Sequence, residues 1–554
     1  MQMPSRMPLI RPLAWAEAAL LFFGLAFTCN AATPQATQVS QADAKCAECH
    51  QDIYRKYLAT PMANASGSAI DNLKTETYLH KSSGVVYSIS ATGDKATLTY
   101  RDSREPTAPG AQTLSYFLGS GHLGVTYLYS IDNYLFESPV AWYAASQSYD
   151  MKPGLAEIRL RPPGLPMESS CLRCHMSDVQ PSDDGTINRH RGLPFLHTGI
   201  TCEACHGDSE KHVRAKGKSA IVNPVRLTAD GRDSVCISCH LEGDVLVERT
   251  GHSPLGYHPG DSISTYVAYY VRGGADVTAR GVSEVEQFAQ STCKRVSGDK
   301  MSCTSCHDPH FTPGPGERAT FYRRKCVACH AQPEFVVSHH QENPDCTSCH
   351  MPRTGAENIP HVAWTDHRIL RTPQDSKAQV ATTTELQPIF SPQATKRDLA
   401  MAYYRLLLEG VRSFEPRAWE LLTEQAGQID NDKDALDALG NLSAERGNNK
   451  TAEQSFRRVL ELDPADLTAS SNLGTLLAKQ GKLDEALALL RPAFDRNRDI
   501  PGLAMNLSRI ECEKGDAASA QSTLQATLVY NPGLEDVQRL LKQMTGCAAS
   551  PGKR

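Results

Sequence analysis

Residues 303–310 read "CTSCHDPH" and contain a five-residue unit, Cys-x-x-Cys-His, that decides how most of this chain folds. The unit occurs seven times between residues 46 and 350 and uses fourteen of the 18 cysteines. Its cysteines are Cys46, Cys49, Cys171, Cys174, Cys202, Cys205, Cys236, Cys239, Cys303, Cys306, Cys326, Cys329, Cys346 and Cys349. Its histidines are His50, His175, His206, His240, His307, His330 and His350.

This unit is the attachment site of c-type haem. The two thiols add to the two vinyl groups of one porphyrin, and the adjacent histidine supplies the proximal imidazole to the iron. Zinc knuckles and disulfides are the alternatives, but neither chemistry requires a histidine after every second cysteine. With 19 histidines in 554 residues, seven of seven excludes coincidence. The sequence therefore predicts seven covalently bound haem c groups.

Twelve further histidines all lie between residues 80 and 367, among the haem units. That restriction indicates that many of them are second axial ligands. Because seven irons offer at most seven sixth positions, several of the twelve must have other roles. A haem with two histidine ligands has no open site and transfers electrons, whereas an empty position permits substrate chemistry.

His310 follows His307 by three residues, and the two cannot bind the same iron. Axial ligands approach from opposite faces of the porphyrin, but three residues span at most about 10 Å when extended. Pro309 also favours extended geometry at Asp308. If His310 is a ligand, it must therefore serve a haem other than that of His307, so that residues 303–310 would hold two neighbouring haems together.

Residues 33–370 form the predicted multihaem domain, with about one haem per 50 residues. Long polar stretches with Gly and Pro turns could not easily bury a core of side chains alone. Stacked porphyrins would supply that core, and without haem we expect this region to be largely unfolded. For the chain as a whole we expect a mostly α fold with much irregular structure, in which a haem-stacked domain is followed by an α-solenoid.

The N-terminus has the layout of a secretory signal peptide over residues 1–32: Arg6 and Arg11, an apolar run, then small residues. A retained membrane anchor and a lipid at Cys29 are the alternatives. No later segment is apolar enough to cross a bilayer. A net charge of −5 without a basic stripe gives no reason to expect nucleic acid. We expect a periplasmic or extracellular protein.

The last third of the chain has a different pattern. Residues 371–397 are rich in Thr, Gln and Pro and read as a linker. Beyond them, small and apolar residues recur every 34 positions, as in Gly447, Gly481 and Gly515. This period is the signature of tetratricopeptide repeats, which form an α-solenoid over residues 398–545, followed by a tail at 546–554. Three repeats, 435–468, 469–502 and 503–536, are clear, and 399–429 is a degenerate fourth.

The chain resembles the multihaem cytochromes related to the tetrahaem cytochrome of ammonia oxidation, in a version fused to tetratricopeptide repeats. The resemblance covers about residues 44–370. The motifs that carry it are "CAECHQDIYRKYLATPMA", "HKSSGVVYSI", "GSGHLGVTYLYSIDNYLFESPVAWY", "GITCEACHGDSEKHV", "CTSCHDPH", "DCTSCHMP" and "HVAWTDHRI".

The resemblance implies that histidines following these motifs are distal ligands. Met62 stands where relatives of the tetrahaem type often have a histidine, so it is either a further candidate ligand or an apolar contact. His258, in "YHPGD", is demoted because relatives tend to carry arginine there. The distal candidates are His80, His122, His212, His310, His361, His367 and Met62.

Three functions fit these observations. The first is an exported electron carrier that docks protein redox partners through its repeats. The second is an enzyme acting on a small nitrogen or sulfur compound at one five-coordinate haem, for which the haem of His50 is the best candidate and Lys294 or Tyr127 could assist. The third is a scaffold that polymerises. The sequence "QSTCK" at 290–294 resembles a lysine-ligated haem unit lacking its first cysteine; a free Cys293 is the simpler interpretation. Cys512 and Cys547 could pair, but spacing does not decide.

Overall fold

The computed structural model describes residues 37–103, 110–153, 155, 164–273, 281–332, 345–355, 359, 361–371, 385–530, 532–544 and 547. The predicted signal peptide, His339, His340 and most of the C-terminal tail lie outside the described residues. No helix in the described part of the chain is long and apolar enough to span a membrane.

Two antiparallel sheets follow the first haem unit. One has the order β3 (Glu76–His80), β4 (Val85–Thr92), β5 (Lys95–Asp102) and β6 (Gly110–Leu114). The other runs β11 (Ser148–Met151), β10 (Val140–Tyr143), β8 (Gly124–Ile131), β7 (Tyr116–Leu118) and β2 (Ser66–Ser68); β9 (Tyr134–Glu137) joins β8 to β12 (Leu165–Pro166). Buried and partly exposed residues alternate along β4, as expected for a strand with one face on a core.

Three smaller sheets lie among the haem units. They are β1 (Thr37–Gln38) with β14 (Phe195–Thr198) and β13 (Met176–Val179); β15 (Val245–Glu248) with β16 (Val267–Arg272) and β19 (Leu386–Ile389); and β17 (Arg353–Gly355) with β18 (Ala363–Thr365). β19 lies inside the segment 371–397, so part of the predicted linker is a strand. Its register with β16 depends on a partner more than 100 residues away, which local composition does not reveal.

The haem units lie on or beside short helices. These helices are α2 (Ala44–Tyr57), α3 (Ser169–Leu172), α4 (Glu203–His206), α6 (Ala229–His240), α9 (Cys303–Cys306), α10 (Arg318–Val327) and α12 (Cys346–His350). The other helices among the described residues of this region are α1 (Val39–Ala42), α5 (Glu210–Arg214), α7 (Glu284–Gln290) and α8 (Thr292–Ser297), with single turns at η1 (Ala69–Asn72), η2 (Pro224–Arg226), η3 (Pro254–Gly256), η4 (Ile263–Thr265) and η5 (Gly298–Lys300). A helical turn places the two cysteines of a unit on one face, three residues apart.

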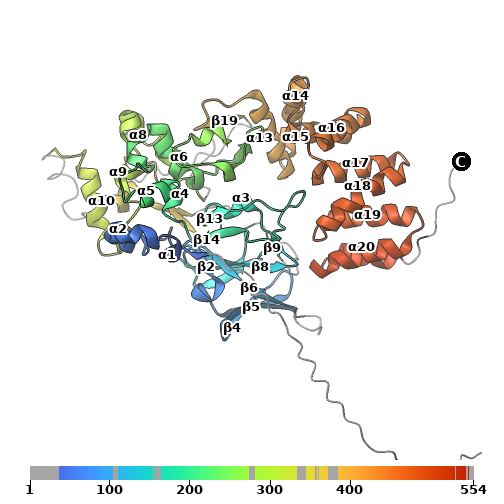
Figure 1. The fold of residues 1–554 in the computed structure, drawn as a ribbon, viewed down its shortest axis with the longest axis horizontal. Coiled ribbons are helices and arrows are strands. Elements are labelled where there is room, and N and C mark those ends of the chain that lie inside the picture. Colours follow the sequence, from blue (N-terminus) through green and yellow to red (C-terminus); the bar gives the residue numbers. More distant parts are fainter. Residues whose placement is uncertain are drawn as a thin grey trace, which may run out of the picture. The chain divides into compact units, whose positions relative to one another are not determined.

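The C-terminal region is an α-solenoid, as predicted, and Figure 1 shows its helices stacked in antiparallel pairs. The pairs are α13 (Lys396–Leu408) with α14 (Glu415–Gln425) after the turn η7 (Arg412–Phe414), α15 (Lys433–Glu445) with α16 (Asn449–Leu462), α17 (Leu467–Lys479) with α18 (Leu483–Arg496), and α19 (Pro501–Glu513) with α20 (Ala517–Tyr530), before a last helix α21 (Glu535–Gln543). Gly440 and Gly474 lie where paired helices approach, because a Cβ there would lie 2.5 Å from Phe456 and 2.6 Å from Leu490. Cys512 and Cys547 form a disulfide.

Candidate haem sites

We number the haem units 1 to 7 in chain order, by their proximal histidines His50, His175, His206, His240, His307, His330 and His350. The question for each unit is whether the structure brings a second imidazole to the face opposite the proximal one. Three units have such a partner among the described residues. The ring pairs are His50 with His212, His206 with His310, and His307 with His367.

The geometry of these pairs is that of two ligands on one iron. Their ring centres are 6.4, 6.0 and 6.2 Å apart, and the rings are 15°, 12° and 30° from parallel. Two metal–nitrogen bonds of about 2 Å, with about 1.1 Å from each nitrogen to its ring centre, separate trans imidazoles by about 6 Å. Direct ring stacking would instead bring nearly parallel rings into van der Waals contact. Each pair therefore leaves room for an iron between its rings.

Hydrogen bonds at the other ring nitrogen orient one imidazole of each pair. Nδ1 of His206 contacts the carbonyl of Val222 at 2.8 Å, and Nδ1 of His212 contacts that of Ser219 at 2.8 Å. Nδ1 of His367 contacts the carbonyl of Thr365 at 2.8 Å. Metal-ligating histidines commonly donate their second N–H in this way, which fixes the tautomer and presents Nε2 to the metal. Nδ1 of His350, in unit 7, similarly contacts the carbonyl of Leu370 at 2.6 Å.

Burial keeps several of these imidazoles in the neutral form that a metal requires. Burial, together with the neighbouring His367, lowers the pKa of His307 to about 4. Burial lowers the pKa of His310 and of His175 as well. Because only a neutral imidazole can ligate, the lowered pKa values of His307, His310 and His175 favour ligation.

The distal candidates separate into two groups. His212, His310 and His367 each face a proximal histidine, and His310 faces that of unit 3 rather than its neighbour His307. The structure does not bring His80, His122 or His361 to a proximal imidazole in any of the described ring contacts; the ligand role of all six histidines stays a prediction.

The second group has other surroundings. His80 is buried, with Nδ1 2.7 Å from the hydroxyl of Ser83, and His122 is exposed. His361 directs Nε2 at a carboxylate oxygen of Asp150, 2.7 Å away.

Met62 packs in an apolar cluster with Val39, Tyr57 and Ala63. Since His212 faces His50, the geometry favours His212 over Met62 as the sixth ligand of haem 1.

The residues considered for an open catalytic site are engaged elsewhere. Lys294 donates through Nζ to the carbonyl of Met301 at 2.7 Å and pairs with Asp233 at 3.5 Å. Tyr127 is fully buried in the sheet core and donates to the carbonyl of Asn72. The structure therefore does not gather Lys294 and Tyr127 beside one haem unit.

Two contacts bring different haem units close together. The thiols of Cys46 and Cys202 lie within 4.8 Å of each other, which places unit 1 beside unit 3. Arg323, which precedes unit 6, directs its guanidinium at the sulfur of Cys346 in unit 7, 4.0 Å away. One of them, Cys46 with Cys202, also lies beside Asp43, where three groups could hold a metal ion. Because both cysteines belong to haem units, their thioether bonds to haem would leave Asp43 as the only one of the three groups available to a metal ion.

Sequence reasoning missed Arg173, which lies between the cysteines of unit 2. Its guanidinium donates to the carbonyl of Ser238, inside unit 4, and its own carbonyl accepts from the thiol of Cys239 at 3.8 Å. An arginine within a variable x-x pair gives no signal by itself, so only the structure shows that it ties two haem units together.

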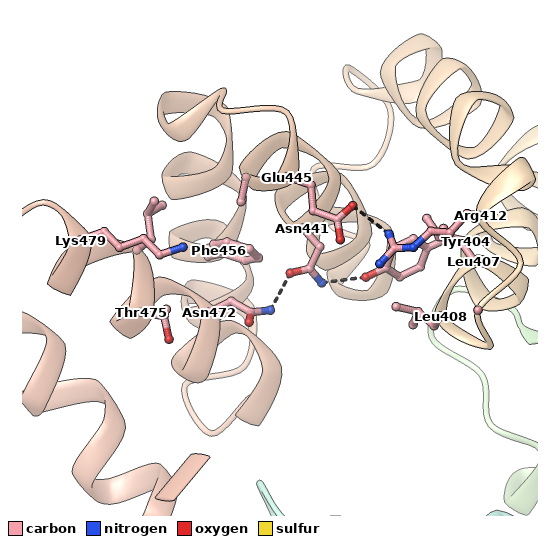
Figure 2. A pocket seen from close by; sticks show the side chains of 13 residues that line it. Tyr404, Leu407, Leu408, Arg412, Asn441, Glu445, Phe456, Asn472, Thr475 and Lys479 are labelled. Carbon is pink, nitrogen blue, oxygen red and sulfur yellow. Dashed lines mark hydrogen bonds and ion pairs between the residues drawn. The ribbon is translucent and has the colours of Figure 1, made fainter. Parts of the chain in front are cut away.

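The solenoid has a cavity of about 510 Å³ on the side of its first helices. Figure 2 shows a row of side chains across it, where Asn441 donates to the hydroxyl of Tyr404 at 2.7 Å and accepts from Asn472 at 2.6 Å. Arg412 pairs with Glu445 at 3.5 Å at one end of the cavity, and Lys479 lies at the other. Amide and cationic groups thus line the cavity beside Leu408, whose side chain is 68% exposed.

Comparisons with known proteins match separate parts of the chain. A model of the doubled CXXCH motif matches residues 295–335, and one of cytochrome c554 and c-prime matches residues 146–207. A tetratricopeptide repeat model matches residues 443–501 and 477–544.

Individual relatives match in the same two parts. Multiheme cytochrome MtrA of Shewanella baltica (strain OS185) is 25% identical over 182 residues, which cover 29% of this chain and 52% of the relative. Cellulose synthase operon protein C of Xanthomonas axonopodis pv. citri (strain 306) is 37% identical over 122 residues, or 20% of this chain and 8% of the relative. The chain thus spans about half of one relative and a small part of the other. Among solved structures, MamA 41-end from Desulfovibrio magneticus RS-1 is 22% identical over 27% of this chain and 85% of its own, with a TM-score of 0.25.

The recurrent units, the facing imidazoles and the two cytochrome matches define a multihaem c-type cytochrome. More particularly, this chain joins such a cytochrome, with a segment of the cytochrome c554 and c-prime type, to a solenoid of tetratricopeptide repeats.

Proposed function

We propose that this protein is an exported electron carrier with seven covalent haems, one at each Cys-x-x-Cys-His unit of a domain over residues 33–370. The observation that carries the proposal is the set of three imidazole pairs about 6 Å apart. When bound, haem c supplies an iron that cycles between the ferric and ferrous states. Two imidazoles hold that iron without an open position, which favours electron transfer over binding of a substrate.

The ligand assignment follows a regular order. The segment after unit 3 supplies His212 to haem 1, the segment after unit 5 supplies His310 to haem 3, and the segment after unit 7 supplies His367 to haem 5. Each sixth ligand therefore comes from the unit two places further along the chain. This order ties the odd-numbered haems into one series, over which electrons can move between adjacent irons.

Export is supported by two features of the sequence and the fold. The signal-peptide layout of residues 1–32 is one. The disulfide between Cys512 and Cys547 is the other, because disulfides persist in oxidising compartments. We therefore place the protein in the periplasm or outside the cell.

The solenoid is proposed to hold a redox partner protein in the cavity of Figure 2. Its asparagine row can exchange hydrogen bonds with an extended peptide, while Lys479 can meet an acidic group. Replacing Asn441 and Asn472 by alanine should weaken partner binding without changing the haem spectra. A loss of haem signals in that variant would show that the row serves the fold instead.

The experiment that tests the carrier function combines mass spectrometry and electron paramagnetic resonance on the purified holoprotein. The mass should correspond to seven haems per chain, and the haems of His50, His206 and His307 should be low-spin. A full-occupancy high-spin haem that binds nitrite or hydroxylamine would instead support the enzyme alternative. Fewer than seven haems would contradict the count.

A further inference from the structure

Helix α10 packs against the segment of unit 5 through aromatic side chains. The ring of Phe311, which directly follows His310, and that of Phe321 in α10 have their centres 6.0 Å apart. Phe321 in turn lies edge-on to Tyr322, with ring centres 5.2 Å apart and planes at 88°. Tilted and edge-on arrangements of this kind are the ones that aromatic rings favour. The contacts hold the unit 5 segment against α10 at the position of Tyr322.

Tyr322 lies beside the proximal imidazole of haem 5. Its ring centre is 5.7 Å from that of His307, with the ring planes at 74°. Its hydroxyl oxygen lies 3.4 Å from Nδ1 of His307. Because Nε2 is the nitrogen that would bond to the iron, Nδ1 carries the hydrogen of the neutral ring, and the hydroxyl oxygen accepts it.

The acceptor at His307 differs in kind from those at two other proximal imidazoles. Nδ1 of His206 lies 2.8 Å from the carbonyl oxygen of Val222, and Nδ1 of His350 lies 2.6 Å from that of Leu370. A main-chain carbonyl is present whatever the side chain, whereas the acceptor at His307 belongs to one side chain, Tyr322. A single substitution that keeps the ring therefore removes this hydrogen bond.

The same helix begins unit 6 and contacts unit 7. Tyr322 and Cys326 are four residues apart in α10 and so lie on one face of it. Arg323 directs its guanidinium at the sulfur of Cys346 in unit 7, 4.0 Å away. Tyr322 thus lies on the proximal side of haem 5, on the helix that brings units 6 and 7 to it.

A hydrogen bond at Nδ1 changes how an axial imidazole binds iron. An acceptor draws the Nδ1 hydrogen away from the ring, which makes Nε2 a stronger base. A more basic ligand stabilises ferric iron more than ferrous iron, so the reduction potential of the haem falls. The bond also fixes the ring plane of His307, which lies 30° from that of His367.

We propose that Tyr322 is a positioning residue that orients the proximal imidazole of haem 5 and lowers the reduction potential of that haem. This role rests on the proposed carrier function and concerns one step of it, the exchange of electrons between haem 5 and the haem of unit 6. One electron enters or leaves the iron of haem 5 in that step, while His307 and Tyr322 keep their hydrogens. No bond forms or breaks, and no proton is transferred.

The test removes the hydroxyl of Tyr322 and keeps its ring. The matched control for Tyr322→Phe is Tyr54→Phe, on the helix of unit 1, where the hydroxyl donates to the carbonyl of Ser40 at 2.6 Å. Both variants are made as full-length holoprotein. A redox titration followed by electron paramagnetic resonance then measures the potential at which each ferric low-spin signal disappears. The signal of haem 5 is the one that His367→Ala converts to high-spin.

We expect Tyr322→Phe to raise the potential of haem 5. At a fixed potential, its ferrous-to-ferric ratio should increase about two- to tenfold, the range that one hydrogen bond supplies. Its low-spin signal should also shift, because the ring plane of His307 is less fixed. The remaining haems, and every haem in Tyr54→Phe, should keep their potentials. An unchanged haem 5, or an equal shift of several haems, would contradict the role of Tyr322.

A second pair of variants tests whether the hydrogen bond is the cause. Methionine has no Nδ1 hydrogen, so adding Tyr322→Phe to His307→Met should leave the potential of haem 5 where His307→Met alone puts it. A shift as large as in the native background would show that Tyr322 acts through its polarity alone, and the proposed role would be wrong. Where the His307→Met chain does not mature, the comparison of Tyr322→Phe with Tyr54→Phe decides.

The outcome separates the role of Tyr322 from the carrier function. If every haem of the native holoprotein is present and low-spin but haem 5 does not respond to Tyr322→Phe, the role of Tyr322 is wrong and the carrier function stands. If haem 5 is instead high-spin in the native holoprotein and binds nitrite, the carrier function is contradicted, and the role of Tyr322 with it.

Discussion

The two regions of this molecule obtain their cores in different ways. In the solenoid, residues one repeat apart fill equivalent places: Ala452, Ala486 and Ala520 are each 0% exposed. In the haem region, α4, α9 and α12 carry three of the seven units and bury no residue of their own. A helix of four or five residues without buried side chains is unstable in water. The comparison teaches that the haem region depends on its cofactor for a core, whereas the side chains of the solenoid form its core without a cofactor.

The sheets of residues 66–151 are intermediate between these two cases. Tyr87, Tyr127 and Tyr129 are each 0% exposed there and belong to one apolar cluster. These strands therefore have a side-chain core of their own although they lie between haem units 1 and 2. The boundary between the two kinds of core does not coincide with the boundary of the haem domain.

The largest expected effect follows from withholding haem. We expect the full chain, produced without c-type haem attachment, to lose structure over residues 200–350 while α15 to α20 stay folded, because porphyrins supply the missing apolar surface. Hydrogen exchange with mass spectrometry should show rapid exchange in α4, α9 and α12 and slow exchange in α17. Equal protection of both regions against exchange would contradict the claim that the haem region depends on its cofactor for a core.

The next effect concerns the buried ion pair at the start of the solenoid. Asp432→Ala removes the bidentate partner of the buried Arg397, whose other carboxylate contacts, with Asp398 and Asp434, are longer at 3.6 Å, and should cost about 3–5 kcal/mol in the free energy of unfolding. The control is Glu424→Ala, which removes the exposed partner of Lys396 and should cost no more than about 1 kcal/mol. Urea denaturation of the holoprotein, followed by far-ultraviolet circular dichroism, measures both. Equal losses would show that burial of the pair does not matter.

The smallest effect concerns one glycine of the 34-residue period. A Cβ at Gly474 would lie 2.6 Å from Leu490, whereas Gly502 in α19 has no atom within 4 Å of that position. We expect Gly474→Ala to be less stable than Gly502→Ala by about 1–3 kcal/mol, because overpacking opposes the gain in helix propensity. The same urea transitions compare the two variants. A stabilising Gly474→Ala would mean that the helices can separate without cost.

The solenoid could be predicted from the sequence because its contacts repeat at a fixed step. Gly440, Gly474 and their partners Phe456 and Leu490 follow from the period alone. The sheets could not be predicted in the same way, since their pairing depends on distant segments: β16 pairs with β19, more than 100 residues later, and β1 with β14. Strand register is set by such tertiary contacts more than by local propensity.

The haem units could be identified from the sequence, but the haem that each distal histidine faces could not. The spacing of Cys303, Cys306 and His307 specifies one covalent haem. The three-residue separation of His307 and His310 is too short for both to bind its iron. Which haem His310 faces depends on how α4 and the segment after α9 meet in space. Arg173, which links units 2 and 4, shows the same limit, because its role arises from a contact with Ser238 that no local pattern records.

The central claim is that haems 1, 3 and 5 each take their sixth ligand from the segment that follows the unit two places further on. The most direct test compares His310→Ala with His367→Ala by electron paramagnetic resonance, with haems 3 and 5 identified through His206→Met and His307→Met. The account predicts that His310→Ala converts only the haem of His206 from low-spin to high-spin, and that His367→Ala converts only that of His307. If His310→Ala instead converted the haem of His307 and left that of His206 low-spin, the claim would be wrong.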